Sequence, residues 1–77
     1  MSSPLTPKQE RLLILFKVAI EKEQDSQRLY AEMLLNCEDP DLRPIIESLL
    51  AAEQSHEELL LDRYTVLRKG GKYGAEN

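Results

Sequence analysis

The sequence predicts an all-α protein: two long helices form an antiparallel hairpin, and two hairpins associate into a four-helix bundle. Apolar residues recur at steps of three and four along two long segments, which is the spacing of one helix face. One short break containing proline separates these segments, and so short a connection folds the helices back antiparallel. The chain has 77 residues and one cysteine, so one domain over residues 1–77 is expected. A core this small, with no internal disulfide, needs metal or a second chain for stability.

The first helix is expected over about residues 7–37. Thr6 can act as its N-cap with Pro7 at the first helical position, and Gln9 completes a capping box. Neither proline nor glycine interrupts the segment before Pro40. One face carries a stripe that is apolar apart from a few polar residues, and it comprises Leu12, Phe16, Ala19, Glu23, Ser26, Tyr30, Met33 and Cys37.

The second helix is expected over about residues 40–69. Asp39 can cap it with Pro40 at the first position, while Pro44 distorts the first turn because its missing N–H interrupts helical bonding. Gly70 and Gly71 are predicted to stop it. Its stripe comprises Leu42, Ile46, Leu49, Glu53, His56, Leu60, Tyr64 and Leu67. Each helix also has a flanking apolar row, which a lone hairpin leaves uncovered, so a homodimer is expected.

The distribution of charge excludes several classes of function. Residues 21–62 contain twelve acidic and three basic residues, and such an acidic surface repels nucleic acid and attracts cations. The longest apolar run, residues 12–16, is too short to cross a membrane. The first residues lack the layout of a signal peptide. A cytoplasmic protein that binds neither nucleic acid nor membrane is expected.

Three polar residues interrupt the apolar stripes, and they point to a metal site. Glu53 and His56 are three residues apart, about one helical turn, so both can reach one ion. Counting outward from the turn places Glu23 of the first helix at the same height. A two-fold dimer doubles this set to four carboxylates and two imidazoles, the ligands of carboxylate-bridged di-iron bundles. Such oxygen-rich sites suit iron or manganese better than zinc. Iron is therefore expected, with manganese, calcium or zinc as substitutes.

Other interpretations of these residues stay open. The three polar residues can instead form a polar layer that sets the register of a helical dimer. Tyr30 lies seven residues after Glu23 on the same face, where it either contacts a ligand carboxylate or packs in the core. Glu57 is either an outer ligand or a solvated acid, and the second interpretation is the more ordinary one.

Three segments resemble the ferritin-like superfamily, over roughly residues 15–67. Residues 19–23 together with Tyr30 resemble the first ligand helix of rubrerythrin-type proteins. Residues 38–43 resemble their turn, and residues 53–60 resemble their Glu-x-x-His helix. Those proteins carry this unit twice, whereas this chain carries it once. The half-length form resembles the encapsulated ferritins, whose two-helix subunits pair to complete a di-iron ferroxidase centre.

This resemblance implies a role for each site residue. Glu23, Glu53 and His56 would be the metal ligands and, with Tyr30 beside the metal, the catalytic residues. It also implies a ring-like homo-oligomer delivered into an encapsulin nanocompartment. Lys22 and Asp25 stand where that family has the acids of an outer metal-uptake site. Residues 72–77 do not resemble the small-and-apolar targeting segment of encapsulin cargo, so the chain is either truncated or not cargo.

The function expected from these observations is oxidation of Fe(II) to Fe(III) in iron storage or detoxification. One alternative keeps the site but makes the protein a rubrerythrin-like enzyme that reduces peroxide. The other alternative is a non-enzymatic helical dimer with a polar registry layer. The sequence does not decide between O₂ and peroxide as oxidant.

Overall fold

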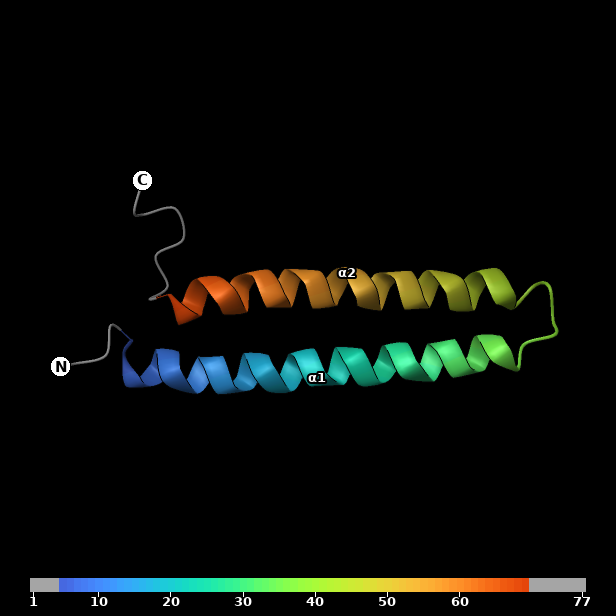
Figure 1. The fold of residues 1–77 in the computed structure, drawn as a ribbon. Helices are drawn as coiled ribbons and strands as arrows, with labels where there is room; N and C mark the ends of the chain where they lie inside the picture. Colours follow the sequence, from blue (N-terminus) through green and yellow to red (C-terminus); the bar gives the residue numbers. More distant parts are fainter. Residues whose placement is uncertain (1–4, 70–77) are drawn as a thin grey trace.

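The structure is a computed structural model that describes residues 5–69, and in this part of the chain it contains two α-helices and no strand. Helix α1 spans Pro7–Leu35 and helix α2 spans Arg43–Arg68. The helices lie side by side and antiparallel, with one short turn at one end of the hairpin (Figure 1). The predicted all-α hairpin is therefore confirmed for these residues. Within the same range, neither helix has the length and apolar character needed to span a membrane.

The outer end of the hairpin begins as the sequence predicts. Thr6 Oγ1 accepts a hydrogen bond from the Gln9 N–H at 3.1 Å, and Gln9 Oε1 accepts one from the Thr6 N–H at 2.9 Å. This capping box satisfies two backbone donors that have no partner inside the helix. At the same end α2 stops at Arg68, one residue before the expected position. Gly70 and Gly71, which were predicted to stop it, lie outside the described residues.

Helix α1 ends at Leu35, two residues before the expected end. The Asn36 N–H bonds to the carbonyl of Met33, only three residues back, at 3.1 Å. The side-chain amide of Asn36 also donates to the Glu32 carbonyl at 2.9 Å. These tighter bonds occupy carbonyls that the next helical turn would need, so the helix does not continue.

Helix α2 begins at Arg43, three residues after the expected start at Pro40. Asp39 does not cap the helix. Its Oδ1 accepts from the Asp41 N–H at 2.8 Å and its carbonyl accepts from the Arg43 N–H at 3.1 Å, which closes a turn ahead of the helix. A start at Arg43 places Pro44 in the first turn, where a missing N–H needs no partner. The later start thus avoids the hydrogen bond that Pro44 would have broken in a longer helix.

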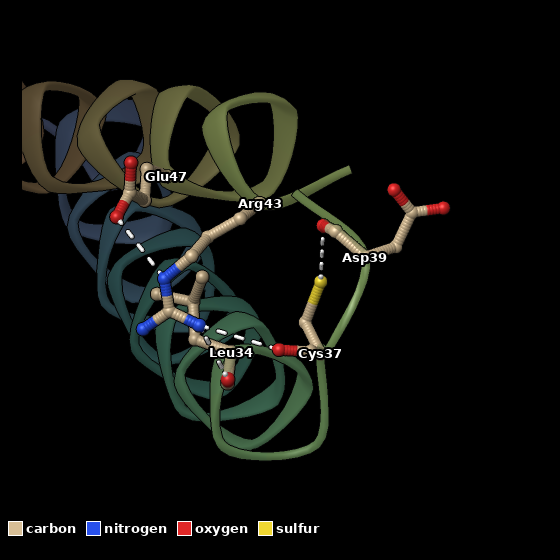
Figure 2. A network of polar contacts seen from close by, with 5 residues as sticks. All are labelled: Leu34, Cys37, Asp39, Arg43 and Glu47. Carbon is tan, nitrogen blue, oxygen red and sulfur yellow. Dashed lines mark hydrogen bonds and ion pairs between the residues drawn. The ribbon is translucent and has the colours of Figure 1, made fainter. Parts of the chain in front are cut away.

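Arg43 joins the start of α2 to the end of α1 (Figure 2). Its Nη1 donates to the carbonyls of Leu34 at 3.2 Å and Cys37 at 3.4 Å. Its Nε lies 3.7 Å from the Glu47 carboxylate, one turn further along α2. The guanidinium therefore supplies positive charge and donors at the end of α1, where carbonyls lack helical partners. The Cys37 thiol, which is free, donates to the Asp39 carbonyl at 3.4 Å.

Little of this hairpin is buried. Among residues 5–69 the buried side chains are Ile20, Ile46 and Leu67. Many large apolar side chains stay exposed on both helices, including Leu12, Ile14, Leu15, Val18, Leu29, Met33, Ile45, Leu49, Leu59 and Leu61. The flanking row of α1 is covered, since Ile20 is buried and Leu13, Gln27 and Leu34 are half-buried. The flanking row of α2 is largely uncovered, since Ile45, Ala52 and Leu59 are exposed. The prediction that a lone hairpin leaves both rows uncovered is therefore correct for α2 and wrong for α1.

The contacts of Arg43 predict its contribution to stability. Arg43→Met should lower the free energy of unfolding by roughly 0.5–1.5 kcal/mol, because two carbonyls lose a charged donor. Urea unfolding followed by circular dichroism measures this. Arg28→Met is the matched control. Within residues 5–69 Arg28 pairs with exposed Asp25 of its own helix, so this change should cost less than about 0.5 kcal/mol. Equal losses in both variants would contradict the bridging role of Arg43.

Candidate metal centre

The three polar residues that interrupt the apolar stripes lie together near the middle of the hairpin. Glu23 comes from α1, and Glu53 and His56 come from α2 one turn apart. One possible ligand atom from each residue lies within 4.8 Å of the other two. The register counted outward from the turn therefore places these side chains correctly. Their role as metal ligands stays a prediction.

The distances within this cluster are short. His56 Nδ1 lies 3.1 Å from Glu53 Oε1 and 3.7 Å from Glu23 Oε1. The Glu23 and Glu53 side chains are 23% and 20% exposed, whereas His56 is 60% exposed. The carboxylates thus lie in the seam between the helices, and the imidazole lies at its solvent-facing edge. The cluster is open on the side that carries His56.

The two carboxyl groups perturb each other. Hydrogen bonding to Glu53 raises the pKa of Glu23, and burial and the nearby Glu53 charge raise it further, against an opposing effect of His56. The same hydrogen bond lowers the pKa of Glu53, with a further lowering from His56. Of the two carboxyl groups, Glu23 is therefore the weaker acid and Glu53 the stronger. A cation bound between them would favour the charged form of both carboxylates.

One oxygen of the cluster has no partner. Glu23 Oε1 is buried and accepts no hydrogen bond within the described residues, and its 3.7 Å separation from the imidazole exceeds hydrogen-bond distance. An unsatisfied buried carboxylate oxygen is costly unless it is paired or coordinates a metal. Two carboxylates and one imidazole suit iron or manganese. The residues present therefore fit a metal ion, and three ligands leave coordination positions for other groups.

The remaining predicted residues lie farther from the cluster. Tyr30 is half-buried on α1, two turns after Glu23, and within the described chain no hydrogen bond joins its hydroxyl to the three cluster residues. Cys37 lies in the turn, away from the cluster. Asp25, where an outer metal-uptake site was considered, is exposed and pairs with Arg28. The structure thus brings together three of the four predicted site residues.

Glu57 contacts the other helix and is not a solvated acid, a role that the sequence did not indicate. Glu57 Oε2 accepts a hydrogen bond from Gln24 Nε2 of α1, and Glu57 Oε1 accepts one from Gln27 Nε2, both at 2.7 Å. These bonds, that from Gln27 first, lower the pKa of Glu57. Gln27 lies in the flanking apolar row of α1, and a polar residue at that position could have indicated a polar contact with α2.

The lowered pKa of Glu57 predicts a pH dependence of stability. The unfolded carboxyl binds its proton near pH 4.3, and the folded one binds it only below its usual range, so these bonds stabilise the fold above about pH 5. Their contribution disappears as the pH falls through the folded pKa. With a chelator present to remove metal, Glu57→Gln should have a lower Tm than wild type. The difference in Tm should be largest at about pH 6 and should shrink towards zero at about pH 3.

Circular dichroism melts at several pH values measure this difference. Glu58→Gln is the control, because it removes the same charge from the next residue, which is exposed. It should leave the Tm nearly unchanged at each pH. A difference in Tm between wild type and Glu57→Gln that stays constant with pH would contradict the hydrogen bonds assigned to Glu57.

Comparison with protein families agrees with this geometry. A family model described as Rubrerythrin matches residues 4–64, which is most of the chain and includes all three cluster residues. Searches of curated proteins and of solved structures gave no match. The resemblance to the ferritin-like superfamily is confirmed at this level, while the encapsulated-ferritin subtype stays a prediction. The chain therefore belongs to the rubrerythrin family.

Proposed function

We propose that this protein is a ferroxidase whose di-iron centre is completed between two copies of the hairpin. The observation that carries the proposal is the cluster of Glu23, Glu53 and His56 in a chain of the rubrerythrin family. That family suggests a di-iron ferritin-like protein, and one hairpin supplies half of the ligands that such a centre uses. Fe(II) is then the substrate, and Fe(III) is the product passed on for storage or detoxification.

The surface around His56 supports a second copy of the chain as the missing half. Leu49 and Leu59 lie seven residues before and three residues after His56, on one face of α2, and both are exposed. On α1, exposed Leu12 lies eleven residues before Glu23 on the same helix face, roughly 16 Å along the axis. Apolar side chains thus flank the open side of the cluster on α2, and Leu12 extends the apolar surface along α1. We call Leu12, Leu49 and Leu59 the apolar rim.

Two-fold symmetry explains both features of this surface together. An isologous interface brings the same patch of both subunits into contact, so the apolar rim of one chain covers that of the other. The same operation places two copies of each cluster residue next to each other. The centre then holds four carboxylates and two imidazoles. A different partner protein would need its own carboxylates at matching positions, whereas a second copy supplies them without further assumption.

Each residue has a distinct part in this function. Glu53 and His56 hold iron from one helix, and Glu23 holds it from the other. Bound iron supplies the redox chemistry: two Fe(II) ions give two electrons, which with two protons convert O₂ to H₂O₂. Carboxylates neutralise the higher charge of Fe(III) and so favour the oxidised product. Tyr30 lies on the same face of α1 as Glu23 and is assigned to the surroundings of the metal.

Other parts of the proposal rest on the sequence resemblance alone. A ring-like assembly and an encapsulin shell follow from the likeness to encapsulated ferritins. Two other functions make different predictions from the ferroxidase. A peroxide-reducing enzyme would oxidise Fe(II) faster with H₂O₂ than with O₂. A registry layer in a helical dimer would not oxidise iron at all.

The ferroxidase proposal predicts iron oxidation that depends on the cluster. Fe(II) added aerobically to the protein should be oxidised faster than in buffer, because the cluster binds iron beside O₂. Glu53→Ala and His56→Ala should each return the rate to that of buffer, while Glu58→Ala keeps it. Stopped-flow absorbance of Fe(III) measures the rate, with O₂ and with H₂O₂ under anaerobic conditions. Unchanged oxidation in both cluster variants would contradict the enzymatic function.

The shared centre also predicts that metal stabilises the dimer. Metal that binds only the assembled state stabilises it by about 2.7 kcal/mol at 100 times its dissociation constant. Leu49→Lys should give a monomer by light scattering and remove the rise in Tm with Mn(II), because a charge enters the apolar rim. Leu61→Lys is the matched control: the two leucines are 42% and 43% exposed, and Leu61 lies on another face of α2.

The control variant should stay dimeric and keep the metal-induced rise in Tm. A Leu49→Lys protein that remains dimeric and binds metal normally would contradict the proposed interface.

A further inference from the structure

A second polar cluster lies directly beside the candidate metal centre, and the function proposed above does not use it. The Glu57 carboxylate accepts from Gln24 with one oxygen and from Gln27 with the other, both at 2.7 Å. All three groups are partly buried. Glu57 follows His56 in the sequence and Gln24 follows Glu23. The contact therefore links the immediate neighbours of one cluster residue on each helix.

The geometry of this contact restricts how α1 and α2 slide past each other. Gln24 and Gln27 are three residues apart on α1, so their amides are stacked along the helix axis. Both oxygens of a single α2 carboxylate are engaged, one by each amide. A shift of α2 by one residue moves Glu57 about 1.5 Å along the axis and lengthens at least one of the two bonds. Two bonds to one carboxylate fix an axial position that a single bond would leave free.

One buried apolar side chain lies close to this contact. Ile20 is three residues before Glu23, whereas the buried Ile46 and Leu67 are seven and eleven residues from the nearest cluster residue on α2. Beside the polar contact there is a surface hollow of about 490 Å³, whose lining includes Gln24, Gln27 and Leu50. Apolar burial is therefore sparse at this height, and the two bonds of Glu57 add to it in setting the register of the helices.

We infer that Glu57 is a positioning residue of the metal centre: it holds Glu23 level with Glu53 and His56, so that the three ligands converge before metal binds. The inference rests on the proposed function, because it assigns a task to a residue beside that site. Both oxygens of Glu57 already accept a hydrogen bond from α1, so the contact with α1 is the role that the structure gives this carboxylate. Outer groups that orient ligands typically change metal affinity by about 10–100-fold when they are replaced.

The test compares Co(II) affinity in two variants that lose the same charge. In Glu57→Gln one acceptor oxygen becomes an NH₂ donor, which faces the amide NH₂ of Gln24 or Gln27 unless that amide turns over, and both contacts lose the charged acceptor that strengthens them. Glu58→Gln removes an exposed carboxylate one residue farther from His56. Dissociation constants are measured by visible absorbance of bound Co(II), at a temperature where circular dichroism shows each protein fully folded. We expect Glu57→Gln to bind about 10–100-fold more weakly and Glu58→Gln to bind like wild type.

A reciprocal exchange tests whether affinity follows the contact itself. The double variant Gln24→Glu with Glu57→Gln restores an amide and a carboxylate facing each other, and it keeps the net charge. Its affinity should return to within about threefold of wild type, with the amide at position 57 donating to the new carboxylate. Because each protein is measured fully folded, a recovery of affinity follows the restored contact and not a change in the folded fraction. If Glu57→Gln does not fold, Gln27→Asn is measured in its place, since it only shortens one amide arm.

The outcomes that overturn the inference differ from those that overturn the metal centre. Co(II) affinity equal to wild type in folded Glu57→Gln, or in Gln27→Asn where that variant replaces it, overturns the inference and leaves the centre intact. Wild-type protein that binds no Co(II), or binds it equally after His56→Ala, overturns the centre and the inference with it. The His56→Ala measurement does not involve Glu57, so the two failures are told apart.

Discussion

Two carboxyl groups face each other across a narrow seam between helices, and this is the constraint on which the rest of the molecule depends. Glu23 and Glu53 are both more than three-quarters removed from solvent, and each shifts the pKa of the other. Apolar residues of the same size would make a more stable pair of helices. The chain therefore keeps a polar layer that its small core does little to compensate, and a bound cation would offset the cost of burying the two carboxylates.

The same layer accounts for the shape of the chain around it. Carboxylates from two helices meet only if the helices are antiparallel and correctly aligned, and several features determine that alignment. The turn and Arg43 set it at one end of the hairpin, where the guanidinium joins the carbonyl end of α1 to α2. The Glu57 contact sets it near the middle. Between these points the hairpin has few buried side chains. Polar contacts therefore determine much of the alignment of the helices, which in a larger protein depends on core packing.

Much of this fold was predictable because its determinants are local. The capping box at Thr6 depends on residues three apart, and the helix stripes depend on a fixed period, so both appear directly in the sequence. The convergence of Glu23 with Glu53 and His56 followed from counting along two regular helices from one turn. The start of α2 was predicted three residues too early. A helix capped by Asp39 would need a backbone N–H at Pro44, which proline lacks, so the helix starts at Arg43 with Pro44 in its first turn. The contacts of Arg43 and Glu57 were not predictable, since they depend on where long side chains reach across the seam.

The short turn between the helices also determines when the proposed centre becomes complete. Helical proteins in which neighbouring segments contact each other fold within microseconds to milliseconds, because little chain entropy is lost before contacts form. The meeting of two chains is slower and depends on their concentration. For a centre shared between copies, ligand convergence within each hairpin therefore comes early and pairing comes late. Under the proposed function, activity would rise more steeply than the abundance of the chain, because each centre needs two copies to meet.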